Sequence, residues 1–118
     1  MANTLTLNNS EIVGKRQFQG LFSTMFKVNA TITDTDAVAI GDTLAMTITV
    51  PGVALGDIVV CWSIDVDRLD GGGDGAVITV AVSAANTVAM YIHADVAEFA
   101  ADALNAAVCK ILIGRAEW

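Results

Sequence analysis

Basic residues are scarce in this sequence. Six Lys and Arg stand against 13 Asp and Glu, which gives a net charge of −7 over 118 residues. The imbalance lies in the body of the chain: residues 28–118 hold three basic and twelve acidic residues, whereas residues 1–27 hold three and one. Because nucleic-acid-binding surfaces are built from Lys and Arg, we expect no nucleic-acid partner. Residues 1–27, which are slightly basic, either dock on an acidic protein surface or are an ordinary terminus.

Long apolar runs are also missing. No window reaches the roughly 18 apolar residues of a membrane span, so we expect no membrane partner. The first eight residues, Met1 to Asn8, lack the basic start and the apolar run of a secretory signal. The sequence therefore predicts a protein that is made and folded in a cytoplasm.

Few residues are suited to catalysis or to metal binding. His93 is the only histidine, and a single histidine at the end of an expected strand, with no base near it in the sequence, favours a structural role. No Ser or Cys triad can be assembled by inspection. Cys61 and Cys109 each lie in an apolar run, so we expect two buried thiols rather than a disulfide or a metal site. We predict no enzymatic activity, no cofactor and no metal.

One segment, Asp65–Gly75, has a superficial likeness to a calcium loop. Leu69 stands at a ligand position, three consecutive glycines follow, and no Glu closes the loop as the EF-hand template requires. We interpret the segment as a solvated hairpin tip, with weak calcium binding as the alternative. Its glycines are not a phosphate cradle, since no Gly-Lys-Ser/Thr follows them.

Apolar and β-branched residues are in excess, at 54% for the apolar class. From residue 43 to 93 they alternate with small or hydroxyl residues, in runs bounded by Gly, Pro, Asp and Asn, which is the pattern of strands and turns. The spacing of Asp95 and Glu98 resembles a capping box, so a short helix is expected near 95–104. The sequence predicts an all-β domain, a jelly-roll-like β-sandwich of about six to eight antiparallel strands.

Several expected strands are apolar on both faces, notably residues 58–64, 77–82 and 108–113. A strand of this kind lies between two layers, or between one layer and another subunit. Charged residues make up only 16% of the chain, below the average of about 25%. We therefore expect a homo-oligomer.

Residues 1–27 differ from the rest because they hold three of the four Phe residues. We interpret residues 1–27 as an N-terminal arm or edge segment and residues 28–118 as the β-sandwich domain, so that removing the arm leaves a folded body. The alternative is an ordinary first strand or helix of the core. Aromatic and Met side chains favour interface centres. The predicted contact residues are Lys15, Arg16, Phe18, Leu21, Phe22, Met25, Phe26 and the terminal Trp118.

Two segments carry a family resemblance. The corner Val50-Pro51-Gly52-Val53-Ala54-Leu55-Gly56-Asp57-Ile58-Val59-Val60 and the hairpin Ala81-Val82-Ser83-Ala84-Ala85-Asn86-Thr87-Val88 resemble a signature of small structural proteins of tailed phages. The chain is similar in this part, residues 43–92, to capsid cement (decoration) proteins. The resemblance implies a β-sandwich body, a homo-oligomer that is often a trimer, and an extended terminal arm on the major capsid protein. Residues 93–104 depart from the family's pattern, which places an Asn-x-Thr-Gly loop before the last strand.

We therefore expect a non-enzymatic virion protein that stabilises the capsid shell from its surface, after assembly in the host cytoplasm. The alternative is a module of a phage tail fibre or baseplate that binds host glycan or assists assembly. Exposed aromatic side chains on one face would favour the glycan reading, and Trp62, Tyr91 and Trp118 are scattered in the sequence.

Overall fold

The protein is a two-layer β-sandwich, as the alternating pattern predicted. The computed structural model describes residues 4–13, 21–33, 37–65, 76–94, 104 and 106–118. Within these residues it contains seven strands and no helix. The strands are β1 (Thr4–Val13), β2 (Phe22–Thr33), β3 (Thr43–Thr49), β4 (Ile58–Ile64), β5 (Ala76–Ala84), β6 (Thr87–Ala94) and β7 (Val108–Ala116). Of the helix expected near 95–104, all but Leu104 lies outside the described residues.

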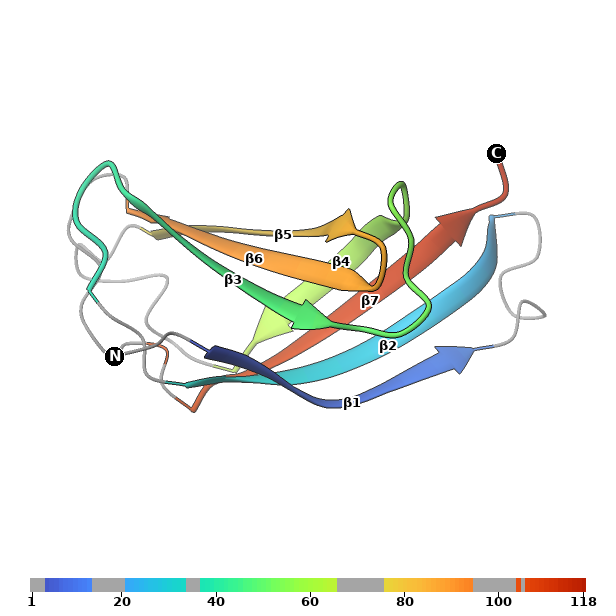
Figure 1. Ribbon diagram of the computed structural model, residues 1–118, viewed down its shortest axis with the longest axis horizontal. Coiled ribbons are helices and arrows are strands. Elements are labelled where there is room, and N and C mark those ends of the chain that lie inside the picture. The colour runs from blue at the N-terminus through green and yellow to red at the C-terminus, as the bar shows by residue number, and fades with distance from the viewer. Residues whose placement is uncertain (1–3, 14–20, 34–36, 66–75, 95–103, 105) are drawn as a thin grey trace.

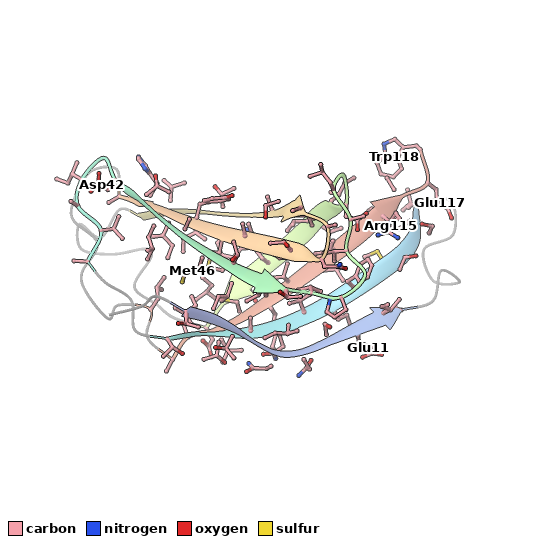
Figure 2. All side chains as sticks on the ribbon, in the orientation of Figure 1. Glu11, Asp42, Met46, Arg115, Glu117 and Trp118 are labelled. Atoms are coloured by element: carbon pink, nitrogen blue, oxygen red, sulfur yellow. The ribbon has the colours of Figure 1, made fainter. Side chains whose placement is uncertain are left out.

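The two sheets are antiparallel and have simple orders. The larger sheet runs β1-β2-β7-β4 and the smaller β3-β6-β5, and the larger one curves beneath the smaller (Figure 1). Alternate residues of the central strands point between the layers, so β2 contributes Phe26, Val28 and Ile32 to the core. From β3, Met46 meets them from the opposite sheet and is almost fully buried (Figure 2). This period-two burial is the reason why these runs form strands.

The expected boundary between an arm and a domain at residue 27 falls inside a strand. β2 pairs with β1 on one side and with β7 on the other, from residue 22 onward. Residues 4–13 and 22–27 are therefore strands of the larger sheet, with β1 at its edge, so the described part of residues 1–27 is an edge segment and not a detached arm. Residues 14–20, which join these strands, lie outside the described part of the chain.

The two ends of the sandwich differ in charge. The connections 34–42, 65–75 and 95–107 all join strand ends at one end, which we call the acidic end (left in Figure 1). In sequence they hold ten of the 13 acidic residues and a single basic one, Arg68. The opposite end carries the β1–β2 connection, the β3–β4 loop, the β5–β6 turn and the C-terminus. Of these acidic residues the structure describes Asp42 and Asp65, and the long axis of the molecule is 43 Å in extent.

Candidate functional site

The β3–β4 loop, residues 51–57, belongs to the first of the two segments on which the resemblance rests. Its backbone requires glycine twice, because Gly52 and Gly56 adopt φ values of +96° and +100°, which other residues reach only with strain. A Cβ added to Gly52 would also lie 3.1 Å from Cε1 of Phe26. These glycines let the loop turn tightly over the core, so that Val53 is buried and Leu55 is exposed.

Arg115 of β7 fixes this loop to the larger sheet. Its Nε and Nη2 donate hydrogen bonds to the two carboxylate oxygens of Asp57, each 2.9 Å long, and Nη2 also donates to the Gly52 carbonyl oxygen at 2.9 Å. The guanidinium carbon lies 5.7 Å from the centre of the Phe26 ring. A bidentate pair of this kind combines charge with fixed geometry.

The Asp57 carboxylate is held in its ionised form. Its side chain is only 4% exposed, and this burial acts to raise the pKa. The hydrogen bonds from Arg115 and from the Ala54 amide, together with the Arg115 charge, outweigh burial and hold the pKa of Asp57 below its ordinary value. The hydrogen bond to Asp57 likewise raises the pKa of Arg115, against the effect of burial. The pair is therefore a permanent ionic clamp at neutral pH.

Asn86, in the β5–β6 turn, brings the second half of the signature to the same place. Its side-chain oxygen accepts a 2.9 Å hydrogen bond from the Gly52 amide, its carbonyl accepts one from the Val50 amide, and its own amide donates to the Val53 carbonyl at 2.7 Å. Its φ of 58° is in the left-handed region that Asn tolerates. The two signature segments thus meet as one hydrogen-bonded corner.

This rigid corner displays Leu55, whose side chain is 74% exposed. Three further apolar side chains are exposed at this end of the sandwich: Ile12 beside Gly52, Leu21 at the start of β2, and the C-terminal Trp118. We call Ile12, Leu21, Leu55 and Trp118 the apolar end. Arg115 and Trp118 lie here, whereas Asp42 lies at the far end (Figure 2). Exposed apolar side chains presented by a fixed backbone are typical of protein-binding surfaces.

The predicted contact residues differ in their exposure. Leu21 and Trp118 are exposed, and Phe22 is half-buried with its ring 5.9 Å from that of Trp118. Met25 and Phe26 are each 1% exposed, so the chain itself covers both side chains, and Phe26 is part of the core. Lys15, Arg16 and Phe18 lie outside the described residues, in the connection that starts and ends at the apolar end.

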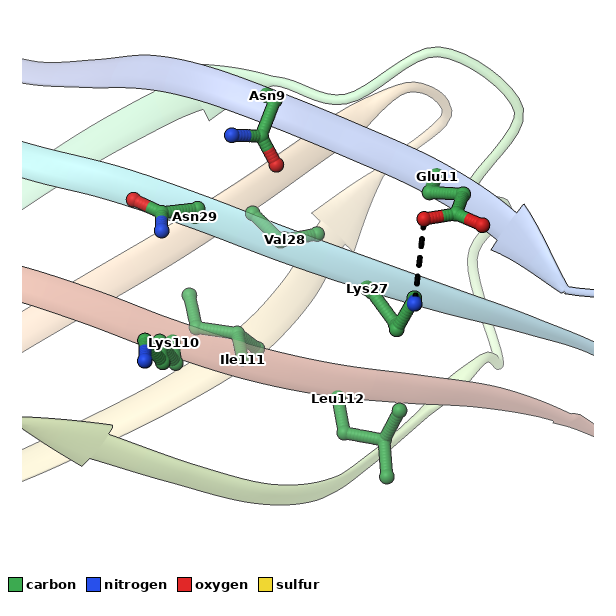
Figure 3. Close-up of a pocket in the computed structure, with 8 residues that line it drawn as sticks. All are labelled: Asn9, Glu11, Lys27, Val28, Asn29, Lys110, Ile111 and Leu112. Atoms are coloured by element: carbon green, nitrogen blue, oxygen red, sulfur yellow. Dashed lines mark ion pairs between the residues drawn. The ribbon is translucent and has the colours of Figure 1, made fainter.

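A shallow groove crosses the outer face of the larger sheet. It is about 310 Å³ in volume and is lined by polar and apolar residues of β1, β2 and β7, among which Lys27 and Glu11 form an exposed 3.1 Å ion pair (Figure 3). Such an exposed pair contributes little to stability. No group of three or more metal-ligating side chains occurs among the described residues. The described residues that line the groove include no Ser, Thr, Cys or His side chain.

The remaining candidates have structural partners or are simply exposed. Thr43 Oγ1 lies 3.0 Å from Nδ1 of His93, and the Asp65 carboxylate accepts a 2.6 Å hydrogen bond from the Val108 amide; residues 66–75 of the suspected calcium loop are outside the described chain. Cys109 is buried, and burial, with the nearby Asp65 charge, raises its pKa to about 11. Cys61 is exposed, so the expectation of two buried thiols is wrong for this residue.

The three aromatic side chains considered for glycan binding lie on different surfaces. Trp62 packs against the core, Tyr91 lies in the middle strand of the smaller sheet, and Trp118 is at the C-terminus. They form no common platform.

Comparisons with protein-family models, with curated proteins and with solved structures found no match. In the part of the chain that the structure describes, no helix has the length and apolar character needed to cross a membrane.

Proposed function

We propose that the protein is a non-enzymatic structural protein of a phage virion, a cement protein that binds the major capsid protein and stabilises the shell as a homo-oligomer. Its place is the capsid surface, reached after assembly in the host cytoplasm. The observation that carries the proposal is the clamped corner, because the residues that resemble the signature of cement proteins hold an exposed leucine in a fixed position.

The mechanism is the burial of apolar surface. Fully burying a leucine side chain is worth about 1.5–3 kcal/mol, and a fixed backbone reduces the entropy lost on binding. Many copies act on one shell, so that modest contacts add up to a large gain in stability. The apolar end is also the end remote from the acidic connections, which favours it as the docking end.

The β1–β2 connection would supply the charged side chains of this contact. Lys15 and Arg16 belong to it in sequence, and its described neighbours Val13 and Leu21 are at the apolar end. We propose that their charges make the contact sensitive to salt.

A charge placed on the corner tests the proposal. Leu55→Asp should abolish sedimentation with empty capsids made from the major capsid protein of the same phage. Ile40→Asp is the matched control, because Ile40 is 61% exposed at the acidic end, and this variant should bind as the wild type does. Equal binding by both variants would show that the corner does not dock.

A further inference from the structure

The edge strands of the sandwich are guarded to different degrees. A free edge is a template for another strand, and proteins usually protect it with charge, proline or a bulge. β1 carries Glu11 and has a bulge after Leu7, and β4 has a bulge between Val59 and Cys61. β5 contains no charged residue and no proline, and its pairing with β6 is regular from Ala76 to Val82, with a register shift only at the end of the strand, between Val82 and Ala84. Among the described strands, β6 is its only hydrogen-bonded neighbour.

The outward residues of β5 are also more apolar than those of the other edge strand of its sheet. Val77 of β5 is 52% exposed, and Thr79 and Ala81 follow it on the same face. On the opposite side, β3 is uncharged and regular too, but its outward residues are small: Thr43, Ala45, Thr47 and Thr49. The β5 edge therefore combines an unguarded backbone with unburied β-branched side chains.

We propose that β5 pairs antiparallel with β5 of a second copy, across a two-fold axis at Thr79. Thr79 is the central residue of the regular segment 76–82, so this register sets Thr79 opposite Thr79 and Val77 opposite Ala81 of the second copy. Cross-strand Thr–Thr pairs and pairs of apolar side chains stabilise such a ladder. Edge pairing of this kind is a known mode of strand addition.

The distribution of charge favours a second copy of the chain as the partner, and favours antiparallel pairing. Each chain carries a net charge of −7, and the strands 58–64 and 76–84 contain no Asp, Glu, Lys or Arg, so two copies can approach here without opposing like charges. β5 starts at the acidic end. Antiparallel pairing therefore places the two acidic ends at opposite extremes of the dimer, where their repulsion is weakest.

The area available sets the strength of the contact. Seven paired residues extend about 23 Å, and the side of a two-layer sandwich is about 20 Å high, so a pair of copies buries about 900 Å² in total. Specific stable interfaces bury about 1,200–2,000 Å². The dimer should therefore dissociate on dilution, and its two-fold symmetry replaces the trimer that the family resemblance implies.

Matched lysine variants of the purified protein test this contact, so the result does not depend on shell binding. In sedimentation velocity over a concentration series, the wild type should pass from monomer to dimer. Thr79→Lys sets two charges face to face and should weaken dimerisation by about tenfold or more. Thr47→Lys makes the same exposed substitution in the other edge strand of the same sheet and should leave dimerisation unchanged.

A cross-link locates the axis. In a Cys61→Ser background, Thr79→Cys should form a disulfide-linked dimer on oxidation, because paired residues across antiparallel strands lie about 4.5–5.5 Å apart at Cα; Thr47→Cys should not. A monomer at every concentration, a trimer, equal effects of both lysines, or no preference between the two cysteines would overturn the proposal. Near-ultraviolet circular dichroism of each variant confirms that it is folded.

Discussion

The ionic clamp between Asp57 and Arg115 should contribute measurably to stability. The Asp57 carboxylate is almost buried and accepts three hydrogen bonds, two from Arg115 and one from the Ala54 amide. Arg115 is 39% exposed, so solvent weakens its share. A hydrogen bond to a charged group contributes about 1.5–3 kcal/mol; with that solvent discount we expect Asp57→Asn to lower the free energy of unfolding by about 2 kcal/mol.

A double-mutant cycle with Asp57→Asn and Arg115→Gln isolates the pair. Urea unfolding, followed by the fluorescence of the tryptophans, should give a coupling energy of about 1–2 kcal/mol, in the range of contacting residues. The reasoning is refuted if the two single substitutions are additive within about 0.3 kcal/mol, or if Asp57→Asn is as stable as the wild type.

The same clamp predicts a dependence on pH. Because the folded pKa of Asp57 is lowered, its contribution to stability is complete above the unfolded pKa of about 4 and is lost as the pH falls through the lower, folded pKa. The stability gap between the wild type and Asp57→Asn should therefore be constant from about pH 7 to 5 and close below about pH 4. A gap that persists unchanged at the acid limit would assign it to packing.

Two further predictions concern β7 and the thiols. Gly114→Ala should lower the free energy of unfolding by about 1–3 kcal/mol, because the new Cβ would overlap the Phe22 ring. In a chain that already carries Phe22→Ala, the same substitution should cost much less. Urea denaturation of the single and double variants measures both effects. One thiol per chain, that of Cys61, should react with a maleimide in the native protein at pH 8, and Cys109 only after unfolding, because it is buried with a pKa of about 11; mass spectrometry of Cys61→Ser, which should remain unlabelled, checks the assignment.

The sequence predicted the layers of the fold but not the order of the strands. Alternation is a local property, so the strands at 43–49, 58–64 and 87–94 follow from neighbouring residues alone. Pairing is not local: β2 lies next to β7, and Ser23 donates a hydrogen bond to the carbonyl of Arg115, 92 residues away. The segment that looked like a separate arm is therefore a strand whose partner comes last in the chain.

The alternation of apolar residues also did not predict which strands lie at the edge of a sheet and which lie at its centre. β4 and β7 both read as apolar on two faces, yet β7 lies inside its sheet and β4 at the edge. Cys109 faces the core and is buried, whereas Cys61 follows a bulge in the edge strand and is exposed. The sequence indicated only some of the residues that form the corner. Its glycines, Asp57 and Asn86 stood out in the sequence, but nothing near Arg115 signalled that this residue clamps the loop.

Sedimentation of the purified protein with empty capsids of the same phage tests the central claim most directly. The account predicts saturable binding by the wild type, retained by Ile40→Asp and lost in a folded Leu55→Asp. A wild-type protein that stays in the supernatant at every concentration would contradict it.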